Sequence, residues 1–422
     1  MGLLLQQRTS EKKQVDAIAS GALVGTSEQL LEVGNQLEAM IASVRALKAF
    51  QDLSGNNADA LNRLKLVMDK VQEHNRIEGH TKSVNGVSYS PKDPLLVSAS
   101  DDKTLRLWKL DGTPVPTVKP MTHDEAVYTV NFSPNGQLIA SASADKTVKL
   151  WKKDGTYITT LKGHEQAVTS VNFSPDSQTI ISASYDGTIR LWQIETISPK
   201  VVIKKLTTLR INNNRNNNVV WYAEFSPNGQ LIASADNESI KLWKKDGTLI
   251  TNLTGHTAAV RYVPFGHDNK TIISTSEDRT IRIWKWQTDP KQIQPKVFTD
   301  KGDKSYIGKF SPNYKYIATA NPDGTTNIWK ASNGAIMDTL SRHKDEIFDL
   351  SFRPDGKEIA TVSKDKTIKI WSLDFIEKNR NDPKNSNSYL IKRGCTWIAD
   401  YLNNNQKDSR QYQDVKKVCR EY

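Results

Sequence analysis

The 422-residue chain has little cysteine, no long apolar segment and no familiar catalytic motif. Its two cysteines, Cys395 and Cys419, exclude a disulfide scaffold and a cysteine-rich zinc module. They could pair with each other, but two cysteines in a long chain fit a reducing compartment, and we expect free thiols. No run of 18 apolar residues is present to span a membrane, and the three leucines at positions 3–5 are too few for a signal peptide. We expect a cytoplasmic protein.

The motifs of common enzyme classes are also absent. Neither His-Glu-x-x-His nor Gly-x-Ser-x-Gly occurs, and His164-Glu165 lacks the second histidine of a zinc site. Gly21 and Gly25 are followed by Thr-Ser without the lysine of a P-loop. We therefore predict that the protein is not an enzyme and has no catalytic residues, no metal and no cofactor. An active site assembled from distant segments is the alternative that a single sequence leaves open.

Tryptophan, in contrast, is abundant and regularly spaced. The chain has ten tryptophans, seven of which lie in similar segments such as LRLWK, VKLWK and IRIWK. These seven are Trp108, Trp151, Trp192, Trp243, Trp284, Trp329 and Trp371, at successive intervals of 43, 41, 51, 41, 45 and 42 residues. A period of roughly 40–45 residues is typical of β-propellers, in which each repeat forms one blade.

Within each repeat, short segments have the chemistry of β-strands. VNFSP, LIASAS and TVKLW alternate apolar and polar residues and are separated by turn sequences. Asp-Gly, which favours hairpins because glycine tolerates positive φ, occurs at residues 111–112, 154–155 and 246–247. Each repeat therefore predicts an antiparallel sheet of about four strands that must pack against its neighbours.

The repeats resemble those of the WD-repeat family. The family's Gly-His pair occurs at residues 79–80, 163–164 and 255–256, and two further histidines follow other residues. A serine or threonine lies four residues before an aspartate, which lies six residues before the tryptophan. The resemblance implies that these four side chains form a buried hydrogen-bonded chain in each blade. The expected chains are His80, Ser98, Asp102 and Trp108; His123, Ser141, Asp145 and Trp151; His164, Ser182, Asp186 and Trp192; His256, Ser274, Asp278 and Trp284; and His343, Thr361, Asp365 and Trp371.

Two repeats depart from this pattern. The fourth lacks Gly-His and has Ala233 and Asn237 at the positions of serine and aspartate before Trp243. The sixth has Thr319 and Asp323 but no histidine. We expect these two blades to be the least rigid.

The resemblance implies an all-β fold, a seven-bladed WD-repeat β-propeller. We assign residues 71–372 to the propeller and residues 1–70 and 373–422 to flanking segments. After Trp371 the chain enters a turn-rich segment, so the seventh sheet lacks a strand. Residues 71–78 precede the first repeat, and we expect them to supply this outer strand and close the ring.

The flanking segments have a helical pattern. Apolar residues step by three and four between Leu30 and Leu47 and again between Leu61 and Val71, which predicts a helical hairpin with a heptad stripe. The stripe can pack within the chain or join another protein. A C-terminal amphipathic helix is predicted near residues 388–402. KLVMDKVQEHNRIEGH and RGCTWIADYL resemble the segments that flank propellers in bacterial STAND or NACHT-type ATPases, which implies a signalling role and a partner ATPase encoded separately.

The net charge of +11 comes mainly from the propeller repeats. Lysines follow most of the repeat tryptophans and are expected on one rim: Lys109, Lys152, Lys153, Lys244, Lys245, Lys285 and Lys330. They either protect exposed strands from aggregation or form a basic surface for nucleic acid or another polyanion.

The opposite face carries large side chains at the positions through which the resemblance implies partner binding. The candidates are Tyr128, Tyr185, Trp221, Arg261, Tyr306 and Phe348, with Asn85 and Thr169 at equivalent positions. Aromatic and arginine side chains dominate interface hot spots, although these could instead be partly buried in the central channel. An asparagine-rich insertion at residues 212–218 is expected on the same face. We predict a non-catalytic scaffold or sensor that binds a protein partner through this face, with polyanion binding by the basic rim as the alternative.

Overall fold

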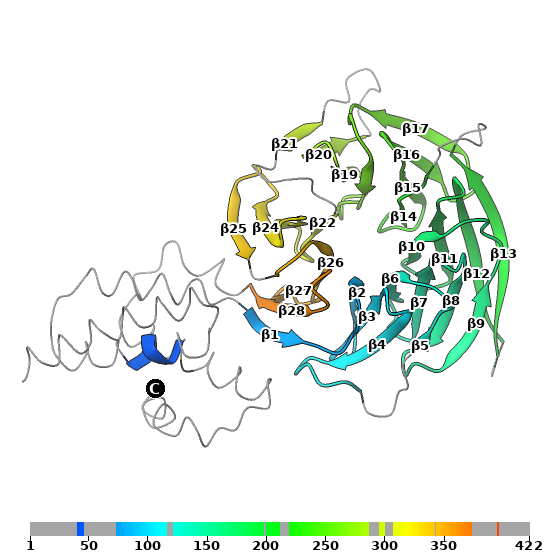
Figure 1. Ribbon diagram of the computed structural model, residues 1–422. Helices are drawn as coiled ribbons and strands as arrows, with labels where there is room; N and C mark the ends of the chain where they lie inside the picture. Colours follow the sequence, from blue (N-terminus) through cyan, green and yellow to red (C-terminus); the bar gives the residue numbers. More distant parts are fainter. Residues whose placement is uncertain are drawn as a thin grey trace, which may run out of the picture. The chain divides into compact units, whose positions relative to one another are not determined.

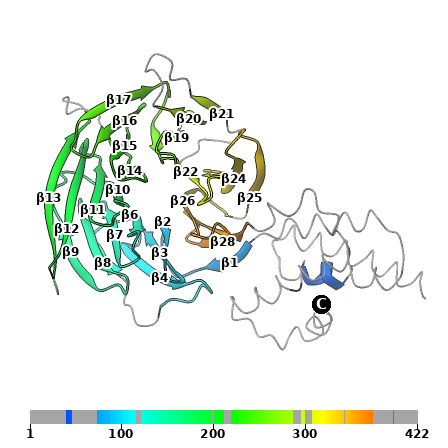
Figure 2. The ribbon, with the colours of Figure 1, turned by 180° about the vertical axis from the view of Figure 1, so that it is seen from behind.

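The fold was analysed in a computed structural model (Figures 1 and 2). It describes residues 40–45, 73–115, 121–197, 200–211, 219–286, 295–299, 307–341, 343–373 and 395. Two compact units are formed by residues 76–370 and by residues 1–75 together with residues 371–422.

The described strands form seven antiparallel sheets of four strands each, which confirms the all-β seven-bladed propeller. The first three blades are β2 Val84–Tyr89, β3 Leu95–Ser100, β4 Thr104–Lys109 and β5 Met121–Thr122; β6 Val127–Phe132, β7 Leu138–Ser143, β8 Val148–Lys152 and β9 Tyr157–Leu161; and β10 Val168–Phe173, β11 Thr179–Ser184, β12 Thr188–Ile197 and β13 Lys200–Arg210.

The next three blades follow the same order along the chain. They are β14 Tyr222–Phe225, β15 Leu231–Ala235, β16 Ser239–Lys244 and β17 Leu249–Thr254; β18 Val260–Tyr262, β19 Thr271–Ser276, β20 Thr280–Lys285 and β21 Lys296–Thr299; and β22 Ile307–Phe310, β23 Tyr316–Ala320, β24 Thr325–Lys330 and β25 Ile336–Ser341. Strands β2, β6, β10, β14 and β22, the first of their blades, lie towards the centre of the ring in Figure 1.

The seventh blade joins the two ends of the repeat array. It contains β26 Ile347–Phe352, β27 Glu358–Ser363 and β28 Ile368–Ser372, and its outer strand is β1 Glu73–Ile77 from before the first repeat. Ile77 is buried together with Val84, Ile368 and Ile370. The expected strand exchange is therefore confirmed, and the ring closes because both ends of the repeat array pair in one sheet.

The core lies between neighbouring blades, because each sheet buries alternate side chains on both faces. Val97, Ala99 and Leu105 of the first blade pack against Val130 and Ile139 of the second. Each such aliphatic side chain stabilises the fold by about 1.5–3 kcal/mol when it leaves water. All seven repeat tryptophans are buried as well: Trp108, Trp151, Trp192, Trp243, Trp284, Trp329 and Trp371.

The third blade accounts for part of the longest tryptophan interval. Its outer hairpin consists of strands of 10 and 11 residues, whereas the inner strand β10 of the same blade has 6. Glu195 and Lys204 form an ion pair of 2.9 Å within the extension. The asparagine-rich insertion at residues 212–218 lies outside the described residues.

Short parts of the flanking segments are described. Residues 40–45 are helical, and Met40, Ile41, Ala42 and Val44 are all buried, so burial in this turn extends beyond the expected stripe. Cys395 is helical and disulfide-bonded, so our expectation of free thiols is wrong; Cys419 lies outside the described residues. The remainder of the predicted hairpin and C-terminal helix also lies outside them. Among the described residues, no helix has the length and apolar character needed to cross a membrane.

Candidate functional site

The third blade shows the complete hydrogen-bonded chain. Trp192 Nε1 donates to Ser182 Oγ at 3.0 Å, Ser182 Oγ lies 2.8 Å from His164 Nε2, and His164 Nδ1 lies 2.8 Å from Asp186 Oδ2. Because the ionised Asp186 can only accept, His164 carries a proton on Nδ1, and Nε2 of a neutral ring then accepts from the Ser182 hydroxyl. Burial opposes ionisation of Asp186, but hydrogen bonds from His164 and Thr188 outweigh it and hold the pKa of Asp186 well below its usual range.

The same arrangement recurs in four other blades. Histidine lies 2.7–2.9 Å from the aspartate and 2.6–2.8 Å from the hydroxyl. The residues are His80, Ser98 and Asp102; His123, Ser141 and Asp145; His256, Ser274 and Asp278; and His343, Thr361 and Asp365. These chains fix the turns of each blade and leave no histidine nitrogen directed at a ligand.

The fourth blade uses different residues from those we assigned. Trp243 Nε1 donates to Ser234 Oγ at 2.9 Å rather than meeting Ala233, and the buried carboxylate is Asp236 rather than a group at Asn237. Asp236 forms an ion pair with the buried Lys241. The repeat is one residue shorter between hydroxyl and tryptophan, so fixed spacing selected the wrong neighbours. A lysine–aspartate pair replaces histidine–aspartate in this blade.

The sixth blade keeps part of the chain. Trp329 Nε1 donates to Thr319 Oγ1 at 2.9 Å, and Asp323 accepts hydrogen bonds from the backbone and hydroxyl of Thr325. Its tryptophan is thus anchored as in the other blades.

Glycine before histidine has a steric reason. Gly255 has φ +139°, and a Cβ there would lie 2.7 Å from Arg282 Nη1. The same crowding occurs between Gly163 and Arg190. In the second blade, Thr122 precedes the histidine and the facing residue is lysine, Lys149, whose Nζ donates to the Thr122 carbonyl at 3.0 Å.

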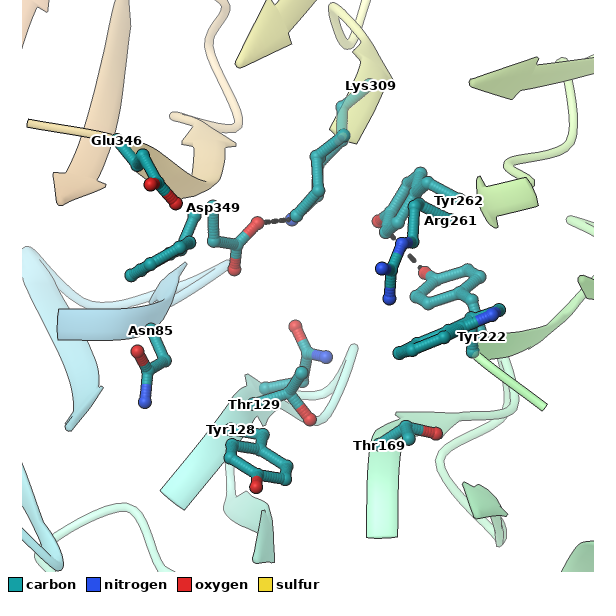
Figure 3. Close-up of a pocket in the computed structure, with 14 residues that line it drawn as sticks. Asn85, Tyr128, Thr129, Thr169, Tyr222, Arg261, Tyr262, Lys309, Glu346 and Asp349 are labelled. Carbon is teal, nitrogen blue, oxygen red and sulfur yellow. Dashed lines mark hydrogen bonds and ion pairs between the residues drawn. The ribbon is translucent and has the colours of Figure 1, made fainter. Parts of the chain in front are cut away.

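The inner strands surround a cavity of about 350 Å³, here called the channel pocket (Figure 3). All seven blades contribute to it. Its lining residues are Asn85, Tyr128, Thr129, Asn131, Thr169, Trp221, Tyr222, Arg261, Tyr262, Ile307, Lys309, Glu346, Phe348 and Asp349. Four of the six expected partner-binding residues are in this set, where they are half-buried rather than forming an exposed ring: Tyr128, Trp221, Arg261 and Phe348.

The remaining two candidates differ in position. Tyr185 packs edge-on against Trp221 at 5.3 Å between ring centroids, outside the pocket lining. Tyr306 lies outside the described residues. The Arg261 guanidinium lies 3.4 Å from the centroid of the Trp221 ring and forms an ion pair with Glu277. Trp221, Tyr185 and Arg261 therefore form one packed cluster beside the pocket.

A second polar cluster crosses several blades and was missed by sequence reasoning. Tyr222 donates to Glu224 Oε2 at 2.8 Å, and its oxygen lies 2.9 Å from the hydroxyl of Tyr262. Lys309 Nζ lies 2.8 Å from Asp349 Oδ1 (Figure 3). Burial raises the pKa of Glu224 to about 7, against the hydrogen bonds from Phe265 and Tyr222 that lower it. The available signal was a charged residue inside the short apolar strand segments YAEF and IGKF.

The tryptophan-following lysines lie at the other end of the blades. Lys109 lies at the end of β4, where it pairs with Leu95 at the start of β3. Asn85, which lines the pocket, follows Val84, and Val84 pairs with Ser100 at the opposite end of β3. Lys109, Lys152, Lys244, Lys285 and Lys330 are exposed, while Lys153 forms a 3.0 Å ion pair with Asp93.

Trp286, to which the repeat pattern assigns no role, donates to the carbonyl of Asn269 at 3.1 Å. Among the described residues, no group of three His, Cys, Asp or Glu is arranged to hold a metal.

Comparison with known proteins agrees with this geometry. The model of the family "WD domain, G-beta repeat" matches residues 71–109, 112–152, 155–193, 204–244, 247–285 and 334–372, together more than half of the chain.

Similar relatives include apoptotic protease-activating factor 1 of Rattus norvegicus, 28% identical over 29% of this chain and 10% of the relative. Nuclear distribution protein nudF of Aspergillus flavus is 34% identical over 26% of this chain and 25% of its own length. Periodic tryptophan protein 2 of Saccharomyces cerevisiae is 29% identical over 29% of this chain and 13% of its own. The matches thus span at most a quarter of these relatives. With the repeats matched over most of the ring, the chain belongs to the WD-repeat family.

Proposed function

We propose that the protein is a non-catalytic scaffold or sensor module that binds a protein partner at the channel pocket and the adjoining Trp221 cluster. The observation that carries this proposal is a cavity to which all seven blades contribute and which is rich in aromatic side chains. Half-buried aromatic and arginine residues around a preformed cavity have the composition of interface hot spots. The hydrogen-bonded chains use five of the seven histidines for structure, so these five are not available for recognition.

The test compares partner capture by two double variants. Trp221→Ala with Phe348→Ala removes aromatic walls from opposite sides of the pocket. Tyr157→Ala with Leu249→Ala removes exposed apolar side chains from outer strands and is the matched control. We expect proteins cross-linked to the wild type to be lost from the pocket variant and kept by the control. If the pocket variant melts as one folded unit and retains every partner, the proposed face is wrong.

A second candidate is polyanion binding by the basic rim. It is supported by the exposed lysines after the repeat tryptophans. The same hairpins carry Asp111, Asp154 and Asp246, which dilute the positive charge. Binding of duplex DNA that weakens steeply with salt would support this candidate, and no binding at low ionic strength would remove it.

The wider context is also a proposal. The sequences of the flanking segments support a partner ATPase or other signalling domain that is encoded separately. We also propose a cytoplasmic location and a division of the chain into domains at residues 1–70, 71–372 and 373–422. The disulfide at Cys395 does not favour a reducing compartment. Fractionation of cells that express the intact chain, with thiol labelling of Cys395, tests the compartment directly.

A further inference from the structure

We propose that the channel pocket receives an uncharged, apolar side chain of the protein partner rather than a basic or acidic one. This inference rests on the proposed function and specifies the chemistry of the partner. It follows from two properties of the lining: its charges are paired within the protein, and aromatic and aliphatic side chains from different blades form part of its surface.

Each charge in the lining already has a counterion within the protein. Arg261 is paired with Glu277 while stacking on Trp221. Lys309 lies 2.8 Å from Asp349. Asp349 also accepts hydrogen bonds from two backbone amides, at 3.1 and 2.7 Å.

The fourth charged residue of the lining, Glu346, also has a counterion. Glu346 lies 3.4 Å from Lys364 Nζ. A charged ligand group would therefore lose its water and meet partners that are already neutralised, which is unfavourable in a half-buried site. A positive ligand group would be repelled by the like charges of Arg261 and Lys309. A negative ligand group would be repelled by those of Glu346 and Asp349.

The uncharged part of the lining includes large apolar and aromatic side chains beside the polar Asn85, Asn131 and Thr169. Tyr128 of the second blade, Ile307 of the sixth and Phe348 of the seventh line the cavity from different sides. Figure 3 shows Asn85 and Tyr128 across an open centre from Arg261 and Tyr262. A volume of about 350 Å³ is near the lower limit of ligand sites, roughly 300–1,000 Å³, and suits one large side chain with a short piece of backbone.

The test uses capped single amino acids as probes: the N-acetyl amides of leucine, phenylalanine, lysine and glutamate, with the full chain and saturation-transfer NMR. We expect the leucine and phenylalanine probes to bind and the two charged probes to bind at least about tenfold more weakly. Phe348→Ala and Tyr128→Ala should each weaken the binding of the apolar probes severalfold, because each removes an aromatic side chain from the pocket wall. Tyr157→Ala on an outer strand should have no effect.

Equal or tighter binding of a charged probe, absence of binding by every probe, or apolar binding that ignores both pocket variants overturns the inference. The proposed function is judged separately by the cross-linking experiment. Loss of partners from the Trp221→Ala, Phe348→Ala variant together with preference for a charged probe would keep the function and reject this chemistry.

Discussion

The most direct test of the inner-strand cluster is the substitution Glu224→Gln. Glu224 is partly buried on β14, accepts hydrogen bonds from Tyr222 at 2.8 Å and from the Phe265 amide at 2.7 Å, and has a pKa raised to about 7. An unfolded chain gives the same carboxyl a pKa near its ordinary value of 4.5. Glutamine reproduces the shape and the neutrality of the protonated acid without titrating.

The sign follows from proton binding. Between pH 4.5 and about 7 the folded state binds more protons at Glu224 than the unfolded state, so this group's contribution to stability falls as the pH rises. The full difference corresponds to roughly 3 kcal/mol above pH 7, at 1.36 kcal/mol for each pH unit between the two pKa values. We expect the free energy of unfolding of Glu224→Gln minus that of wild type to be roughly 2–3 kcal/mol larger at pH 8 than at pH 5, so that the variant gains stability relative to wild type as the pH rises.

The assay is urea unfolding of both proteins at the two pH values, with equal slopes required for comparison. Comparing the variant with wild type matters because burial lowers the pKa of His256, which makes stability rise with pH in an overlapping range in both proteins. Glu165→Gln, at an exposed position, is the control. A difference between Glu224→Gln and wild type that stays constant from pH 5 to pH 8 would refute the reasoning.

Three further substitutions test the blade interiors. His164→Ala leaves Ser182 and Asp186 without their central partner and should lower the free energy of unfolding by about 2–4 kcal/mol, measured by urea unfolding. Lys241→Met should lower the free energy of unfolding by about 3–5 kcal/mol, because it leaves the buried Asp236 without its counterion. Adding Asp236→Asn should recover part of this stability in thermal melts, and no recovery would contradict the ion-pair assignment. Lys146 has φ +71°, so Lys146→Gly should raise the free energy of unfolding by about 0.5 kcal/mol in denaturant melts, and a loss would mean that its side chain contributes more than the backbone strain.

The fold was predictable because its determinants are local and repeated. Tryptophan, aspartate and the hydroxyl residue lie within ten residues of one another in most blades, as Trp192 and Ser182 do. The fourth blade was mispredicted because a single-residue shift moved the hydrogen bonds to Ser234 and Asp236, and one spacing rule cannot detect such a shift.

The channel pocket was only partly predictable for a different reason. Its polar contacts join blades that are distant in sequence, such as the Asp349 carboxylate and the Val87 amide, 262 residues apart. Four of the residues that we chose from their positions in the repeat line the pocket, because these positions recur in each blade. Glu224 and Lys309 do not follow it, so their partners are set by the closure of the ring and not by any local pattern.

The contact between glycine and arginine beside the histidine chains makes two distant positions depend on each other during evolution. At Gly255, a side chain would face both an unfavourable φ and the Arg282 guanidinium, which is itself held near Thr280 and Asp278. A side chain at residue 255 therefore requires Arg282 to move or to be replaced. In the second blade, where Thr122 stands in place of the glycine, the facing residue is Lys149. The effect of a mutation at the glycine thus depends on the residue 27 positions later.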